Sequence, residues 1–188
     1  ECVFCIVDLH AMTAPYQASA LPRNVLDAAI TYLAAGVDPA KAILFVQSQV
    51  REHAELNWIL NCVTPVGDLL RMTQYKEKSR QFQKDLNAGL LNYPILMAAD
   101  ILLYQTEVVP VGQDQQQHVE LARTIARTFN HRFGQTFIEP KVRLRKEGAK
   151  IMSLTDPKKK MSKSIPGSCL YLFDEPEEIK KKIMTAVT

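Results

Sequence analysis

The hydrophobic positions of the chain fall first into short continuous runs. Residues 2–8 and 42–48 are largely apolar and rich in β-branched and aromatic side chains, and residues 108–112 form a shorter run of the same kind. Runs of this length are typical of strands that are covered on both faces of a parallel sheet. The pattern therefore predicts three buried strands.

Between and after these runs the apolar residues recur three and four positions apart, which is the period of an amphipathic helix. The first such segment ends at about Ala35, where Gly36 can close the helix as a C-cap. The other segments are residues 51–63, the nearly all-apolar 92–104, 113–134 and 176–187. Strands and helices therefore alternate, which predicts an α/β fold with a parallel sheet flanked by helices.

Two cysteines, Cys2 and Cys5, form a CxxC within the first run. Positions three apart in a strand point to opposite faces, so the two sulfurs do not readily share a ligand. No second CxxC completes the usual zinc set, and no protein-bound metal is expected. Packing in the core is the favoured interpretation, and a redox or metal site is the alternative.

Length and composition narrow the class of protein. Of 188 residues, 47% are apolar and 23% are charged, which is close to the globular average and excludes collagen-like and disordered chains. No apolar run approaches the roughly 20 residues that span a bilayer, and no leading segment resembles a signal peptide. We therefore expect a soluble, cytoplasmic protein that has no membrane partner.

The net charge of +3 is unevenly distributed along the chain. Residues 1–70 carry a net charge of −4 and residues 71–188 carry one of +7, and within 141–163 nine basic residues outnumber two acidic ones. Such a block favours a polyanionic partner, namely a nucleotide, a nucleic acid or a membrane surface, and a solvated basic surface is the alternative. After residue 134 the sequence also changes to short, basic stretches interrupted by glycine and proline. We therefore expect a core of residues 1–140 followed by a segment of residues 141–188.

The first candidate site is VPVGQDQ at residues 109–115. A predicted strand ends here, Gly112 lets a ligand approach the backbone closely, and Asp114 lies at the start of the next helix. Ligands of open α/β sheets bind at the carboxyl ends of strands, where helix N-termini attract anions. A carboxylate at this place suits ribose hydroxyls, and an ordinary helix N-cap is the alternative.

The second candidate site is Asp100, inside the apolar segment LMAADILLY. A carboxylate in a buried helix is costly unless it finds hydrogen-bond donors. The donor could be a buried arginine, water at a helix face or a ligand, and an indole N–H, which only donates, would need such an acceptor. Tyr93 and Met97 lie on about the same helical face and could either wall an aromatic pocket or belong to the core.

The third candidate site is KMSKS at residues 160–164, between DPKK and IPGS. Its two lysines and two serines are all donors. Two cations three residues apart suit a charged leaving group such as pyrophosphate. A lysine-rich loop without a ligand is the alternative, but the five-residue string is far more specific than a run of charge.

Taken together, these motifs resemble those of a known family. KMSKS resembles the signature of class I aminoacyl-tRNA synthetases, and MAADILLY followed by VPVG and DQ points to their tryptophanyl–tyrosyl branch. MTQYKEKS at residues 72–79 and IVDLHAMT at residues 6–13 extend the resemblance over essentially the whole chain. Met97 and Asp100 favour the bacterial-type tryptophanyl-tRNA synthetases. The alternatives are a tyrosyl homologue and a non-catalytic paralogue that binds nucleotide or RNA.

The resemblance implies a Rossmann-like nucleotide-binding fold and a role for each matched residue. Asp100 would accept the indole N–H, and Gln115 would reach the polar end of tryptophan. The tryptophan pocket would be lined or bordered by Val7, His10, Tyr93, Met97, Ile101, Val109 and Val111. ATP would be held by Gly112, Gln113 and Asp114 at the ribose, by Ile151 at the adenine, and at the triphosphate by the KMSKS residues Lys160, Met161, Ser162, Lys163 and Ser164. Lys78, Lys160 and Lys163 would be the catalytic residues.

The implied reaction has two steps, in which the tryptophan carboxylate attacks the α-phosphate of ATP and tRNA(Trp) then takes the acyl group. ATP is thus a substrate, Mg²⁺ accompanies the pyrophosphate, and a homodimer is expected, with its interface on the apolar helices near residues 51–104.

The resemblance begins after the family's first strand and HIGH-type motif and stops before its helical anticodon-binding domain, so the 188 residues alone are expected to be inactive. Leu9, Gln113 and Ile165 stand where the family commonly has glutamine, glutamate and aspartate.

Overall fold

The computed structural model describes residues 2–81, 86–144, 151–162 and 165–187, without the side chains of residues 78, 80 and 81. The chain forms two compact units, Glu1–Leu144 (unit 1) and Arg145–Thr188 (unit 2), which are described separately. Their division falls slightly after the expected boundary at residue 140, because Lys141–Leu144 pairs as a strand within unit 1.

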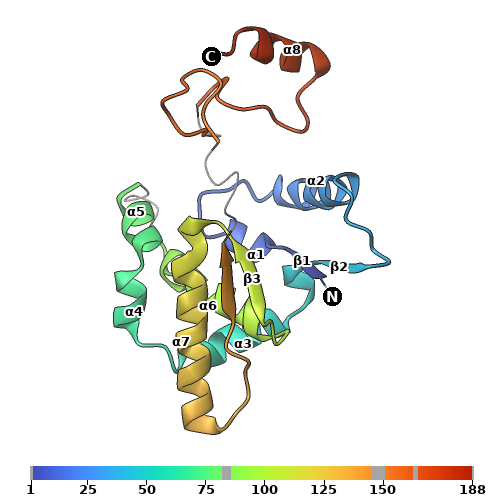
Figure 1. Ribbon diagram of the computed structural model, residues 1–188. Helices are drawn as coiled ribbons and strands as arrows, with labels where there is room; N and C mark the ends of the chain where they lie inside the picture. Colours follow the sequence, from blue (N-terminus) through green and yellow to red (C-terminus); the bar gives the residue numbers. More distant parts are fainter. Residues whose placement is uncertain (1, 82–85, 145–150, 163–164, 188) are drawn as a thin grey trace. The chain divides into compact units, whose positions relative to one another are not determined.

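The strands that the structure describes form two parallel ladders (Figure 1). β1 (Cys2–Ile6) pairs with β2 (Ala42–Val46), and β3 (Val108–Val111) pairs with β4 (Lys141–Leu144). The three predicted strands are confirmed, and both ladders are parallel, but β3 pairs with β4 and not with the β1–β2 ladder. The sequence does not predict β4, because its alternating basic residues merge with the basic block that follows.

The prediction that the strands are covered on both faces is wrong for β1 and β2. Val3 and Ile43 lie directly opposite each other in the ladder and are 40% and 44% exposed. Helix α2 (Leu21–Ala34), which packs against β1, contributes no buried residue. Cys2 is exposed, so its predicted place in the core is also wrong.

Cys5, the second cysteine of the CxxC, is half-buried. Its burial and the negative charges of Asp100 and Asp8 raise the pKa of its thiol to about 12. The thiolate, not the thiol, is the species that binds metals and exchanges disulfides. Cys5 is therefore protonated at neutral pH, which supports a packing role.

Unit 1 contains the predicted helices and further short ones. α2, α3 (Glu52–Asn61), α6 (Ala88–Leu102) and α7 (Gln116–Phe133) confirm the helical periodicity, and Gly36 follows α2 with a φ of 98°. The sequence does not predict the other helical elements, which are α1 (Asp8–Ala11), α4 (Val66–Arg71), α5 (Thr73–Gln81) and the 3-10 turn η1 (Gln47–Gln49). Within the described ranges, no helix has both the length and the apolar character needed to cross a bilayer.

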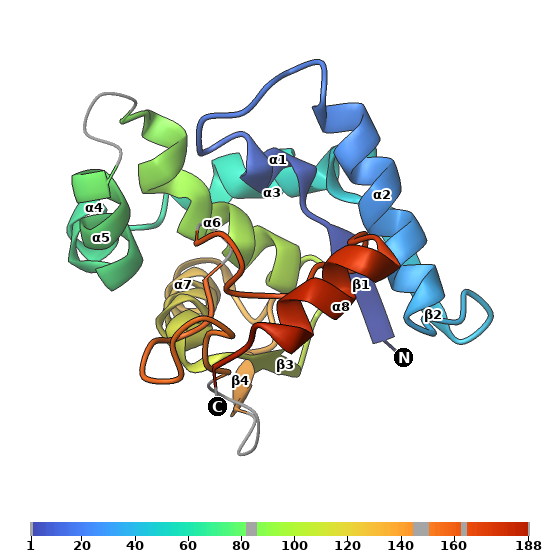
Figure 2. The same ribbon diagram turned by 90° about the horizontal axis from the view of Figure 1, so that it is seen from above.

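The core of unit 1 lies where α6 packs against α3 and α7 (Figures 1 and 2). Leu60 of α3, Ile95 and Leu102 of α6, and Val119 of α7 are at most 1% exposed. Burying an aliphatic side chain this completely contributes about 2 kcal/mol. The core therefore fixes α6, and with it the one acidic residue of that helix, Asp100.

Unit 2 combines a short antiparallel pairing with one helix. Met152 and Lys160 form an isolated bridge, and next to it the Met161 N–H donates to the Ile151 carbonyl at 2.9 Å. Helix α8 (Pro176–Met184) confirms the last predicted helix. The pairing fixes the backbone at the start of the KMSKS segment.

An ion pair anchors α8 within unit 2. Lys182 Nζ lies 2.6 Å from an Asp174 oxygen and 3.2 Å from Glu178 Oε1, and it lies over the Tyr171 ring, 5.0 Å from the centroid. The side chains of Lys182 and Asp174 are only 12% and 8% exposed. The hydrogen bond from Lys182, with that from the Tyr171 N–H, lowers the pKa of Asp174.

Acid should therefore loosen α8. Because the folded-state pKa of Asp174 lies below its unfolded value, the ion pair stabilises unit 2 fully above the ordinary carboxyl pKa of about 4. This contribution is lost as the pH falls from there through the lowered pKa of Asp174. We expect Asp174→Asn to speed amide exchange in α8 at neutral pH, and the difference from wild type to shrink below about pH 4 when hydrogen exchange is followed. A difference that is independent of pH would contradict the assignment.

Candidate functional site

Asp100 lies at the centre of a polar cluster in unit 1. Its Oδ1 accepts hydrogen bonds from Gln47 Nε2 at 2.7 Å and from His53 Nδ1 at 2.6 Å, and its Oδ2 accepts one from His10 Nε2 at 2.8 Å. Gln47 and His53 are fully buried, whereas the side chains of His10 and Asp100 are 17% and 13% exposed. Oδ2 accepts one of these hydrogen bonds, from the partly exposed His10, and is thus on the more accessible side of the carboxylate.

The donors of this cluster differ from those considered from the sequence. Among the described side chains they are two histidines and an amide, rather than a buried arginine. His10 is predicted at the site, whereas the sequence singles out neither His53 nor Gln47. Both come from elements at least 47 residues away in sequence from Asp100, a separation that periodicity cannot bridge.

Tyr104, which is 36% exposed, extends the cluster beyond His53. Its hydroxyl lies 2.8 Å from His53 Nε2, while the opposite ring nitrogen of His53 contacts Asp100. Burial, followed by the nearby Cys5 and Asp100, raises the pKa of Tyr104, so its hydroxyl keeps its proton and can donate. The spacing of Asp100 and Tyr104 by four residues, one helical turn, is the sequence signal that could have joined them.

Tyr93 lies beside the cluster, as expected for a residue at the same site. Its ring meets that of His10 edge-on, with centroids 6.2 Å apart, and its hydroxyl lies 2.9 Å from His118 Nε2. Burial raises the pKa of Tyr93 to about 12, so the hydroxyl stays protonated. The structure therefore brings two of the expected residues, His10 and Tyr93, to Asp100.

The other residues expected around tryptophan lie on neighbouring parts of unit 1. Ile101 belongs to the buried core, and Met97, Val109 and Val111 are partly buried against it. Val7, between β1 and α1, is 45% exposed. That these residues line a tryptophan pocket stays a prediction, since packing in the core equally explains the positions of Ile101 and Met97.

The turn after β3 brings the Gly112 backbone close to the side chain of Asp114, while the predicted approach of a ligand stays a prediction. Gly112 precedes the 3-10 turn η2 (Gln113–Gln115), and a Cβ added to Gly112 would lie 2.7 Å from Asp114 Oδ1. The Asp114 side chain caps neither η2 nor α7, so the ordinary N-cap alternative is wrong. Instead it accepts a hydrogen bond from Gln115 Nε2 at 2.9 Å, and both Gln113 and Asp114 are exposed.

Only part of the predicted phosphate-binding set falls within the described chain. Lys160, Met161 and Ser162 are described, whereas Lys163, Ser164 and the side chain of Lys78 lie outside the described residues.

The described part of KMSKS is held by backbone contacts. The Met161–Ile151 hydrogen bond joins it to the residue expected at the adenine. The Ser162 N–H donates to Ser168 Oγ at 3.0 Å, and Ser168 is fully buried. Lys160 is exposed. The segment therefore combines an anchored backbone with a cationic side chain in solvent.

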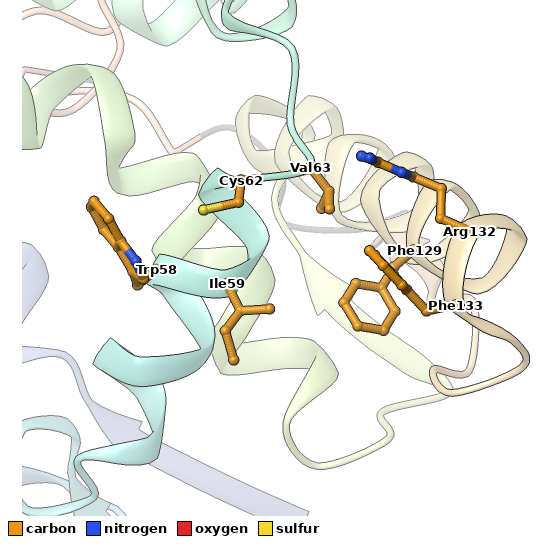
Figure 3. Close-up of a pocket in the computed structure, with 7 residues that line it drawn as sticks. All are labelled: Trp58, Ile59, Cys62, Val63, Phe129, Arg132 and Phe133. Carbon is orange, nitrogen blue, oxygen red and sulfur yellow. The ribbon is translucent and has the colours of Figure 1, made fainter.

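A hollow of about 560 Å³ lies between α3 and α7, apart from the Asp100 cluster (Figure 3). Trp58 is 72%, Phe133 59% and Ile59 49% exposed. Ile59 and Phe133 fit the helical period of residues 51–63 and 113–134 but are exposed, because these apolar stripes continue beyond the part of each helix that meets α6. The hollow is lined by Trp58, Ile59, Cys62, Val63, Phe129, Arg132 and Phe133.

The fold and the site define a Rossmann-like α/β protein of the class I synthetase kind. A solved tryptophanyl-tRNA synthetase from Campylobacter jejuni, in complex with ADP and tryptophan, superposes with a TM-score of 0.89 at 42% identity over 98% of this chain and 56% of its own. A tyrosyl-tRNA synthetase from Aeropyrum pernix superposes with a TM-score of 0.73 at 20% identity, covering 98% of this chain and 53% of its own, which shows the fold alone.

Sequence comparison gives the family directly. The family described as tRNA synthetases class I (W and Y) matches residues 1–188, and the chain belongs to it. Curated tryptophan–tRNA ligases of Caldanaerobacter subterraneus and Bacillus anthracis are each 54% identical over the whole chain. The chain spans 58% and 57% of the length of these relatives.

Proposed function

We propose that the gene product containing this chain activates L-tryptophan with ATP and transfers the tryptophanyl group from the adenylate to tRNA(Trp) in the cytoplasm. The observation that carries the proposal is the Asp100 carboxylate, a fixed acceptor beside Tyr93 in a family with tryptophan–tRNA ligases among its members. An indole N–H only donates, so its recognition requires such an acceptor. A site built around this bond rejects analogues without the donor by a factor on the order of 10⁴.

We propose further that ATP binds at the carboxyl end of β3, with Gly112, Gln113 and Asp114 at the ribose and the KMSKS lysines at the phosphates. Displacement at phosphorus needs little covalent help, so the protein contributes mainly positioning and neutralisation of charge. The described residues contain no cluster of three or more metal-ligating side chains. Mg²⁺ would arrive with the nucleotide and keep phosphate oxygens and water as its ligands.

The deciding experiment is ATP–pyrophosphate exchange by the gene product. We expect exchange that depends on tryptophan and is not supported by tyrosine. Exchange with tyrosine only would replace the proposal by a tyrosyl-specific enzyme. Nucleotide binding with no exchange for either amino acid would replace it by the non-catalytic alternative.

Gly112→Ala should weaken ATP binding about tenfold, which is the order expected for loss of one hydrogen bond to a charged group. The added Cβ would displace the Asp114 carboxylate, whose Oδ1 lies 2.7 Å from its position. Calorimetric titration with a non-hydrolysable ATP analogue measures the effect. Gly67→Ala is the matched control, because its Cβ would meet only Arg71, at 3.5 Å; equal losses in both variants would contradict the assignment.

We also propose that the α3–α7 hollow is the contact between two copies of the protein. An exposed aromatic and aliphatic patch of this kind is typical of an interaction surface. Trp58→Glu should weaken self-association roughly a hundredfold, as for other buried interface tryptophans, when sedimentation equilibrium is measured. Leu26→Glu is the control, since Leu26 is 52% exposed on a different helix. If the Trp58→Glu protein stayed dimeric, the α3–α7 hollow would be excluded as the contact between the two copies.

A further inference from the structure

We propose that His53, held by Tyr104, is a positioning residue that turns the Asp100 carboxylate so that Oδ2 presents its remaining acceptor site to the ring N–H of the substrate. The inference rests on the proposed function and adds a specificity determinant behind the residue that would touch the ligand. It is built on the contacts of Asp100 with three side chains and of His53 with Tyr104.

The hydrogen-bond count at Asp100 shows which oxygen is left for a ligand. A carboxylate has about four acceptor sites, two on each oxygen. Gln47 and His53 fill both sites of Oδ1, and His10 fills one site of Oδ2. The fourth site therefore belongs to Oδ2, on the side of the partly exposed His10. A rotation of the carboxylate would break both short bonds at Oδ1.

The two contacts of His53 fix which of its nitrogens carries the proton. A carboxylate only accepts, so Nδ1, which faces Asp100 Oδ1, must carry a hydrogen. In the neutral ring Nε2 is then an acceptor, and the Tyr104 hydroxyl donates to it. Tyr104 thus holds His53 in the tautomer that donates to Asp100, as a second partner commonly does for functional histidines.

Packing holds the His53 ring in the orientation that these bonds require. His53 is fully buried. Its ring centroid lies 5.5 Å from that of Phe45 and 5.5 Å from that of Tyr104, and the latter two are 5.7 Å apart. Ring pairs at such distances add stabilisation beyond the area they bury. His53 is therefore a rigid donor, and a rigid donor is what can orient the carboxylate.

The test separates hydrogen bonding from packing by the choice of variant at His53. Asparagine places an amide N–H near the position of Nδ1, whereas glutamine places its amide near Nε2. His53→Leu removes both polar contacts, and Tyr104→Phe removes only the hydroxyl. The gene product and each variant are titrated with tryptophan and with its sulfur isostere, benzothienylalanine, which lacks the ring N–H. Thermal unfolding is measured alongside.

The readout is the ratio of the two affinities. We expect His53→Leu and His53→Gln to lower the preference for tryptophan over the isostere by about tenfold, and His53→Asn to keep it within about threefold of wild type. Tyr104→Phe should lower it about threefold. A purely structural role would lower the unfolding temperature and leave the ratio unchanged.

The outcomes distinguish this inference from the proposed function. If wild type prefers tryptophan but His53→Gln and His53→Asn have equal ratios, the positioning role is overturned while the proposed function stands. If wild type does not prefer tryptophan over the isostere, the inference fails together with the Asp100–indole contact on which it rests, and the proposed function is then decided separately by ATP–pyrophosphate exchange. Because His53→Asn, His53→Gln and Tyr104→Phe conserve size, loss of folding in His53→Leu leaves the test intact.

Discussion

Replacing Asp100 by asparagine should weaken tryptophan binding roughly a hundredfold while ATP binding changes by no more than about twofold. The carboxylate accepts from three donors and has one acceptor site left on Oδ2. In asparagine one oxygen becomes a donor amide. If the amide nitrogen replaces Oδ2, a donor faces His10 and the ligand's N–H, and the acceptor that an indole requires is lost. If it replaces Oδ1, a donor faces Gln47 and His53, and the hydrogen bonds that hold the remaining acceptor in place are lost.

The measurement is a pair of calorimetric titrations, one with tryptophan and one with an ATP analogue. Glu120→Gln is the control, because Glu120 pairs with Arg123 on the exposed side of α7 and meets no residue of the cluster. It should leave both affinities at the wild-type level. If Asp100→Asn weakened tryptophan and ATP equally, the carboxylate would have a general structural role and the indole assignment would fail.

The sequence predicts the elements of the fold well because their signal is local. Continuous apolar runs give β1, β2 and β3, and helical periodicity gives α3, α6 and α7, which are all confirmed. Periodicity also identifies which face of a helix is apolar. It does not identify what covers that face: Ile59 and Phe133 fit the apolar stripes and are nevertheless exposed.

For the candidate site too, the sequence predicts what is local and misses what depends on tertiary packing. Asp100 stands out locally, as an acid in an apolar helix, and the sequence therefore predicts it. Its partners Gln47 and His53 lie in polar contexts that are ordinary for a strand end and a helix, and only the packing of α3 against α6 brings His53 to the carboxylate. Hydrogen bonds between residues so far apart in sequence depend on tertiary structure, which a single sequence does not display.

Lys160→Ala should slow adenylate formation about a hundredfold while leaving tryptophan affinity unchanged. Lys160 is exposed, and its backbone is fixed by the bridge to Met152, so its charge is available to a nucleotide without the entropy cost of ordering the chain. A preorganised donor that meets charge developing in the transition state contributes on the order of 10² to 10³ in rate. In the proposed reaction this contact would strengthen only as the pyrophosphate leaves, so its loss should lower the rate and not the binding of the amino acid.

The neighbouring lysine supplies the matched control. Lys159 has the same charge and lies in the same pairing, but its Nζ is 3.3 Å from Asp156, so its charge is already partly neutralised. Single-turnover formation of pyrophosphate should therefore be nearly normal in Lys159→Ala and strongly slowed in Lys160→Ala. Equal slowing in the two variants would mean that the segment acts only through its total positive charge. A difference between adjacent lysines instead requires that one side chain meets the phosphates at a defined place, which is the property that separates a catalytic loop from a basic surface.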